Sequence, residues 1–328
     1  KTSMDPQDFF VPHFFITHQI DEKFSVGTGV SAPFGLGTRW PSEWIGRYLA
    51  IETELQVLSV PLVVSWMVTD NFAISIGGSY NHATVLIKQK TPQTPFEGDA
   101  FVEMEGDDAA AFGYNFAFMW KPSDIVSIGG SFKSQVSYTF EGTAKTTGAE
   151  QLSARFPSGD ISAELNTPVN IHGGVAVQVL KQLRLSADFQ FVGWSSYDKL
   201  AVDIADPDIE DISQPRDYTD SYILRLGGEF FINERISLLG GIYYDKFPVE
   251  ADNVSPSLPD SDRLGFSFGI DAKITNNLGV TGSYLFIRSD ELTVTNSREQ
   301  YTSGNSPFNG TYNSKANLFS LSFYYSFN

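Results

Sequence analysis

The stretch VSIGGSFKSQVSYTF, from Val126 to Phe140, decides the fold class because its side chains change character at every second position. Its even positions are mostly apolar, and its odd positions are polar or glycine. A period of two residues predicts a β-strand with one greasy and one polar face. The same alternation recurs at 183–193, 222–232 and 319–327. We therefore expect an all-β protein.

Composition narrows the class further. The chain has 328 residues, of which 14% are aromatic and 41% hydrophobic, and no segment holds the roughly 18 consecutive apolar residues that a spanning helix requires. It has no cysteine, so disulfides and thiolate metal sites are excluded. A net charge of −17 argues against nucleic-acid partners. The acidic segments 103–109 and 203–217 fit either solvated loops or divalent-cation bridges to anionic lipid head groups.

The connections between the expected strands alternate between short and long, which is typical of an outer-membrane barrel. A closed barrel in lipid turns its apolar face outward and its polar face to the lumen. Trp66, Trp120 and Trp194 lie near strand ends, where membrane interfaces place aromatic residues. Short turns are expected near 21–23, 69–71, 121–124, 180–182, 233–235 and 275–277, and long loops near 33–48, 91–108, 146–159, 200–218, 247–261 and 289–311.

These connections join thirteen strands, whereas bacterial single-chain barrels normally have an even number. We expect a transmembrane antiparallel β-barrel of 13 strands in this chain, and 14 with a missing N-terminal strand. Residues 1–328 are expected to form one barrel domain.

No motif nominates a reaction. The four histidines, His13, His18, His82 and His172, lack metal-ligand spacing, and no nucleophile elbow, phosphate loop or dinucleotide fingerprint occurs. We expect no catalytic residue, metal or cofactor. Several charges fall on polar faces and either form a salt-bridged, hydrated interior or supply a cation for a ligand carboxylate. The two candidates for such a cation are Arg184 and Arg225.

Four strings resemble the FadL/TodX family of outer-membrane transporters for long-chain fatty acids and other hydrophobic compounds. The first, FGLGTRWPSEWIGRYLAIETEL (34–55), includes the W-x-x-x-W-x-GRY spacing of that family. The others are FVGWSSYD (191–198), LRLGGEFFINERISLLGGIYYDKFPV (224–249) and LPDSDRLGFSFG (258–269). The resemblance implies an N-terminal hatch and a first strand, both absent from this sequence.

The resemblance also implies a kink in the strand that carries Pro33, opening a lateral gate through which substrate leaves into the membrane. Gly35 aligns with the kink glycine, and Pro33, Phe34 and Gly37 are its neighbours. Proline lacks a ladder donor and glycine admits unusual backbone angles, so these residues suit a break. Spacing alone equally allows the strand simply to end there.

The resemblance further implies that two extracellular loops capture substrate, which here places Phe96, Phe101, Met104, Leu152 and Phe156 at the ligand. A basic ligand contact of the family falls near Thr219, which cannot pair with a carboxylate. We expect passive uptake of long-chain fatty acids or apolar hydrocarbons by a monomer in the outer membrane of a Gram-negative bacterium, with hydrophobic molecules and membrane lipids as partners. The alternatives are a general porin for polar solutes and a barrel-based lipid or peptide hydrolase.

Overall fold

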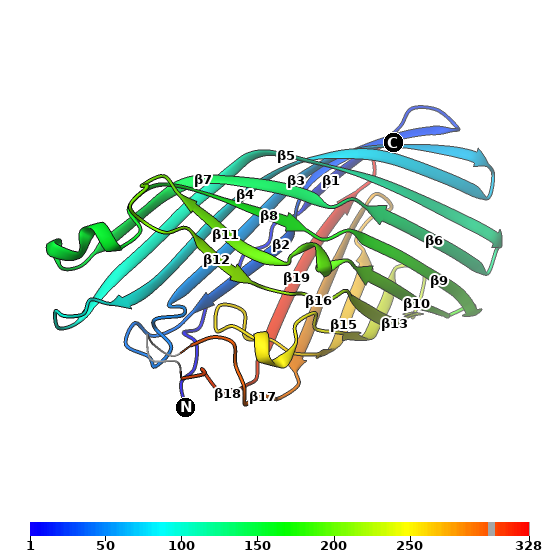
Figure 1. Cartoon of the computed structure of the whole chain (residues 1–328). Coiled ribbons are helices and arrows are strands. Elements are labelled where there is room, and N and C mark those ends of the chain that lie inside the picture. Colours follow the sequence, from blue (N-terminus) through cyan, green and yellow to red (C-terminus); the bar gives the residue numbers. More distant parts are fainter. Residues whose placement is uncertain (301–305, 328) are drawn as a thin grey trace.

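In this computed structural model, which describes residues 1–300 and 306–327, a seventeen-stranded antiparallel sheet curves into a barrel wall (Figure 1). A separate pair, β17 and β18, lies in a long loop. The strands are β1 Phe14–Gln19, β2 Phe24–Arg39, β3 Glu52–Thr69, β4 Phe72–Pro92, β5 Asp99–Ser123, β6 Val126–Lys133, β7 Val136–Thr147, β8 Gly159–Thr167, β9 Asn170–Leu180, β10 Leu183–Val192, β11 Lys199–Ile204, β12 Ile212–Pro215, β13 Ser221–Phe231, β14 Ile236–Asp245, β15 Arg263–Lys273, β16 Leu278–Ser289, β17 Leu292–Val294, β18 Gly310–Tyr312 and β19 Lys315–Tyr325. Three short 3-10 helices accompany them: η1 Glu150–Arg155, η2 Trp194–Ser196 and η3 Ala251–Asn253.

Several of these strands are halves of one longer run. β5 pairs with β7 along its first half and with β6 along its second half. On their other edges, β6 pairs with β9 and β7 pairs with β8. Taking β6 with β7, β8 with β9, β10 with β11 and β12 with β13, the described wall contains the thirteen runs expected from the sequence. The short turns lie where they were expected, for example at 70–71, 181–182 and 274–277.

Several predicted long loops are too long, because strands extend into them. β2 continues to Arg39 and β4 to Pro92, and β5 already begins at Asp99. Segments predicted as loop also hold the short strands β11, β12, β17 and β18. The connections at 148–158 and 246–262 are loops, as predicted, with one 3-10 helix each.

The outer face of the wall is apolar. Leu58, Leu62 and Trp66 lie on one face of β3 and are exposed, whereas Val57, directly before Leu58, faces the other way and is completely buried. Phe24 stacks on Trp66 beside the short turns, with ring centroids 6.3 Å apart. Large hydrophobic side chains in such numbers on a sheet surface suit contact with lipid. Trp194 was predicted to lie at a membrane interface with Trp66 and Trp120. Its ring instead lies edge-on to Phe34.

A row of irregularities crosses six of the runs. β2 bulges at 32–33 and β5 at 109–110, opposite His82, and β5 loses its ladder to the next run over 108–114. The next runs break at 134–135, 168–169, 193–198 and 216–220, between the paired halves described above. We call this row the crease. Because a bulge or break re-aims the side chains that follow it, the crease changes which residues face the lumen.

The crease corrects the prediction for the stretch 126–140. Phe132 lies on the outer face, 5.9 Å from the exposed ring of Tyr114. After the break, Tyr138 is only 2% exposed and packs with Val57 and Ala83, which belong to the inner face. The even positions therefore do not form one face. The alternation of residue types continues, but the side on which the apolar residues lie is reversed.

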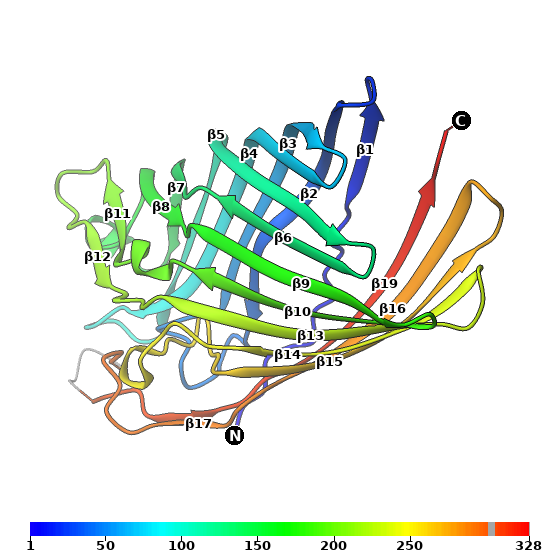
Figure 2. The same ribbon diagram turned by 90° about the vertical axis from the view of Figure 1, so that its right-hand side faces the viewer.

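The two ends of the sheet, β1 and β19, lie beside each other in Figure 2. No register of paired residues joins them within 1–300 and 306–327, and His13 Nε2 and Ser322 Oγ are 3.4 Å apart across that boundary. Within residues 1–300 and 306–327, no helix is long and apolar enough to cross a bilayer.

Candidate functional site

The predicted kink in β2 is a bulge and not the end of the strand. Ser31 pairs with Ser59 and Phe34 pairs with Val57, so Ala32 and Pro33 together face the single residue Leu58. Pro33 has no N–H to give to a ladder, which suits it to the extra position. Pairing with β3 then resumes and continues to Arg39.

Beyond the bulge, alternate residues of β2 point to opposite sides of the wall. Phe34 packs on the inner cluster and lies 6.2 Å from Trp194 at 80°, and Thr38 Oγ1 donates to the Ser257 carbonyl at 3.0 Å. Gly35 and Gly37 therefore face outward. A Cβ on Gly35 would come no closer than 3.8 Å to the Leu55 carbonyl, whereas one on Gly37 would collide with the Phe9 ring.

The edge of β2 that faces β1 is only half paired. β1 pairs with residues 25–30 of β2, and the next backbone contact on this side is the bond from the Asp5 N–H to the Arg39 carbonyl at 2.8 Å. Within the described residues, 31–38 carry no strand partner along this edge. We call this edge the seam. The bulge and the glycines predicted for the lateral gate lie along it.

The interior behind the seam is apolar. A buried cluster at the crease joins Val57, Ala83, Ala111 and Phe140 to Tyr138, and Phe34 packs against it from β2. The cluster brings together side chains from β3, β4, β5 and β7, which are distant in sequence. Of its aromatic members, only Phe34 was predicted from the sequence, because the reversal of faces after residue 135 leaves no mark in the residue types.

The predicted loop residues fall into separate groups. Leu152 and Phe156 are buried against Ala100, and Met104 is buried with Val102 and Ala144 in another cluster. Phe96 is exposed at the tip between β4 and β5. Ala149 N–H donates to Gln93 Oε1 at 2.7 Å, which holds the two loops together. Phe101 lies on β5 three residues before Met104, on the opposite face of that strand.

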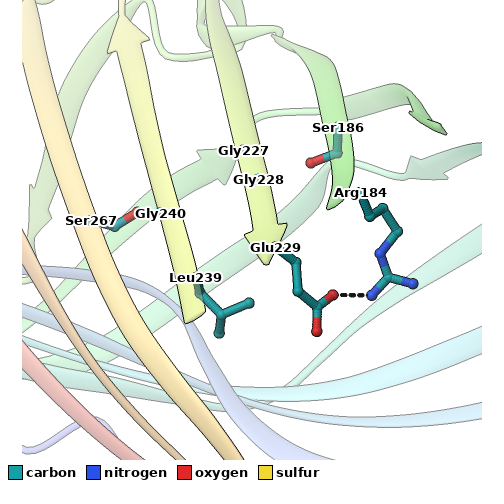
Figure 3. Close-up of a pocket in the computed structure, with 8 residues that line it drawn as sticks. All are labelled: Arg184, Ser186, Gly227, Gly228, Glu229, Leu239, Gly240 and Ser267. Atoms are coloured by element: carbon teal, nitrogen blue, oxygen red, sulfur yellow. Dashed lines mark hydrogen bonds and ion pairs between the residues drawn. The ribbon is translucent and has the colours of Figure 1, made fainter. Parts of the chain in front are cut away.

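Arg184 lines a lumenal cavity of about 270 Å³ (Figure 3). Its guanidinium pairs with Glu229, which also accepts a hydrogen bond from Ser237 Oγ at 2.8 Å. Figure 3 shows this pair beside Gly227 and Gly228, where the wall carries no side chains. The remaining lining residues are Ser186, Leu239, Gly240 and Ser267.

Arg225, the other predicted lumenal cation, lies outside the lining of this cavity. It donates to Asp188 Oδ1 at 2.8 Å and to Gln190 Oε1 at 2.6 Å. Both arginines are thus paired inside the wall, which is the arrangement expected of a salt-bridged interior. Thr219 is engaged as well, since its hydroxyl donates to the Pro248 carbonyl at 3.0 Å.

The two tryptophans after the bulge tie the long loops together. The rings of Trp40 and Trp44 stack with centroids 4.2 Å apart and planes 9° apart. Trp44 Nε1 donates to the Ala50 carbonyl at 2.7 Å, and Trp40 Nε1 donates to the Pro256 carbonyl at 3.0 Å. Phe308 closes the cluster edge-on to Trp44 at 5.8 Å. The W-x-x-x-W spacing therefore serves loop packing at the mouth of the barrel.

Asp262 fastens another loop at the same end. Burial would raise the pKa of its carboxyl group, but hydrogen bonds from Tyr244, from the Phe247 N–H and from Lys246 outweigh burial and hold the pKa below its ordinary value of 3.8. The Phe247 N–H donates to Asp262 Oδ1 at 3.0 Å.

In the described part of the chain, no group of three or more His, Asp or Glu side chains is arranged to hold a metal ion.

A sequence model for the outer membrane protein transport protein family (OMPP1/FadL/TodX) matches residues 1–327. Outer membrane protein P1 of Haemophilus influenzae is 23% identical, over 97% of this chain and 75% of its own length. The long-chain fatty acid transport protein of Escherichia coli is 21% identical, over 97% of this chain and 77% of its own.

Solved structures agree in fold. A Pseudomonas aeruginosa FadL homologue superposes with a TM-score of 0.89 at 21% identity, over 97% of this chain and 78% of that chain. The Ralstonia pickettii toluene transporter TbuX gives a TM-score of 0.73 at 16% identity, over 97% of this chain and 81% of that chain. The barrel fold predicted from the sequence is confirmed.

Proposed function

Because this chain belongs to the OMPP1/FadL/TodX family of outer membrane transport proteins, we propose that it carries hydrophobic small molecules inward and releases them sideways at the seam. It is an outer-membrane protein of a Gram-negative bacterium. The substrate would be captured at the extracellular loops, move down its gradient and leave past the bulge in β2. No cofactor or catalytic step is part of this proposal.

The observation that carries the proposal is the seam, the unpaired β2 edge beside an apolar interior cluster. Phe34 belongs to that cluster and directly follows the bulge, so it links the interior to the seam. Farther down the lumen lie the ion pairs Arg184–Glu229 and Arg225–Asp188. A hydrophobic molecule gains nothing from displacing water around such pairs, whereas the membrane beyond the seam is apolar. Sideways release is therefore favoured over passage to the periplasm.

The pairing of the lumenal arginines also bears on the substrate. A fatty-acid carboxylate would need a cation, but Arg184 and Arg225 already hold Glu229 and Asp188. Thr219 is neutral, and its hydroxyl is committed to a backbone carbonyl. We therefore favour neutral or weakly polar hydrocarbons over long-chain fatty acids as substrates.

The test compares two glycine variants in cells. Gly35→Ile fills the outer face at the seam, where the nearest atom to a new Cβ is 3.8 Å away, so the barrel should still fold. Gly282→Ile is the matched control, because Gly282 lies on β16, away from the seam, where it pairs with the outward-facing Ile270 and a Cβ meets nothing within 4 Å.

Uptake of radiolabelled toluene and oleate is measured against cells with the empty vector. We expect transport of toluene by the parent chain, little by Gly35→Ile and parental transport by Gly282→Ile. Undiminished uptake by surface-expressed Gly35→Ile would refute lateral release. Steady ion conductance of the purified protein in a planar bilayer, without hydrocarbon uptake, would favour a porin instead.

A further inference from the structure

A segment before β1 runs beside the seam. It is fixed at one end by the bond from the Asp5 N–H to the Arg39 carbonyl, and at the other by the start of β1 at Phe14. We call residues 5–13 the strap. The strap contains no strand residue, so no ladder holds it along β2. Segments with few backbone pairings move at a lower free-energy cost than strands within a sheet.

Within the strap, Phe9 is the residue that touches the seam. Its ring lies so close to Gly37 that a Cβ there would collide with it, although Gly37 does not have the positive φ that demands glycine. Close approach of the ring is therefore the reason for glycine at position 37. Phe9 is 56% exposed, whereas its neighbour Phe10 is 93% exposed.

We infer that Phe9 sets the size of hydrophobic molecule that can leave through the seam, an inference that rests on the proposed lateral release. The ring covers the outer face of β2 at Gly37, where the strand carries no side chain. A small molecule passes beside the ring, whereas a larger one must displace the ring and expose its buried half to solvent or lipid. The strap can swing aside because Asp5 and β1 hold only its ends.

The experiment changes the ring and keeps the seam. Phe9→Ala removes the cover, Phe9→Trp enlarges it, and Phe10→Ala is the matched control on the exposed neighbour. The probes are radiolabelled toluene and the bulkier pyrene, taken up by cells with equal amounts of surface protein. We expect Phe9→Ala to raise the pyrene-to-toluene uptake ratio about fivefold, because a half-buried ring no longer has to be displaced. Phe9→Trp should lower the ratio, and Phe10→Ala should leave it unchanged.

A second variant reaches the same ring from the other side. Gly37→Ala introduces the Cβ that would collide with Phe9, so it should push the ring away and raise the ratio as Phe9→Ala does. In the double variant Phe9→Ala/Gly37→Ala the second change should add nothing.

An unchanged ratio in both Phe9 variants, with uptake still abolished by Gly35→Ile, would overturn the role of Phe9 and leave lateral release standing. If Gly35→Ile itself transports normally, or the parent chain transports neither probe, lateral release and this inference are both refuted.

Discussion

Deleting Pro33 should straighten β2 and stop transport without disturbing the rest of the wall. The bulge places Ala32 and Pro33 opposite Leu58 alone. Removing Pro33 leaves Ala32 opposite Leu58, and the flanking pairs Ser31–Ser59 and Phe34–Val57 keep their partners. Each remaining side chain therefore keeps its face of the sheet. Few single-residue deletions in a strand have this property, because a shift by one residue normally exchanges the faces.

The expected gain in stability follows from the ladder. Closing the bulge restores one or two backbone hydrogen bonds between β2 and β3, each with a net contribution of about 0.5–1.5 kcal/mol. The deletion should therefore raise the free energy of unfolding by about 1–2 kcal/mol. In the same protein, toluene uptake should fall to the level of empty-vector cells, because the strap can pair along a straight β2 and close the seam.

The assay pairs uptake with urea unfolding of the purified barrel, followed by the gel shift between folded and unfolded forms. Pro33→Ala is the control, since it removes the ring but retains the extra residue and hence the bulge. It should transport like the parent chain. Normal uptake by a correctly folded deletion variant would show that the bulge is not required for release, and our explanation of the seam would be wrong.

Three further changes test the packing described above. Tyr138→Ala empties a fully buried site in the inner cluster and should cost about 3–5 kcal/mol of unfolding free energy, measured in urea, while Tyr138→Phe should cost far less. Trp44→Ala removes the ring stacked on Trp40, so the far-UV exciton signal of the pair should vanish and proteases should cut the long loops faster, whereas Trp44→Phe retains part of the packing. Asp262 has a lowered pKa, so its stabilisation is present above its ordinary pKa of 3.8 and is lost as pH falls through the lowered pKa. Asp262→Asn should therefore be less stable than the parent at neutral pH, and the difference should disappear in acid.

The periodic parts of the chain could be predicted because each side chain there faces either the lipid or the lumen. Leu185 and Phe189 alternate with Arg184 and Asp188, and the structure places the first pair on the exposed outer face and the second in lumenal ion pairs. The bulge was only half predictable. Pro33 signals disruption, but whether a strand ends or bulges depends on Leu58 of the neighbouring strand, which continues to pair.

Contacts between distant segments could not be predicted in this way. The reversal after residue 135 leaves the alternation of residue types intact and shows only in the neighbours of Tyr138. Gly37 was predicted only as a neighbour of the kink, and its contact with Phe9 exists only because the strap returns along β2. The strands β11 and β12 were missed because they have only six and four residues, too few to express a period.

The crease also has a mechanical consequence. Hydrogen-bond ladders resist bending, so a wall interrupted at one level in six of its thirteen runs is softer along that level than above or below it. The half of the barrel nearer the short turns, here called the hoop, should move as one rigid body. The half that carries the long loops can tilt relative to it. Amide hydrogens beside the crease should accordingly exchange with solvent deuterium earlier than those of the hoop.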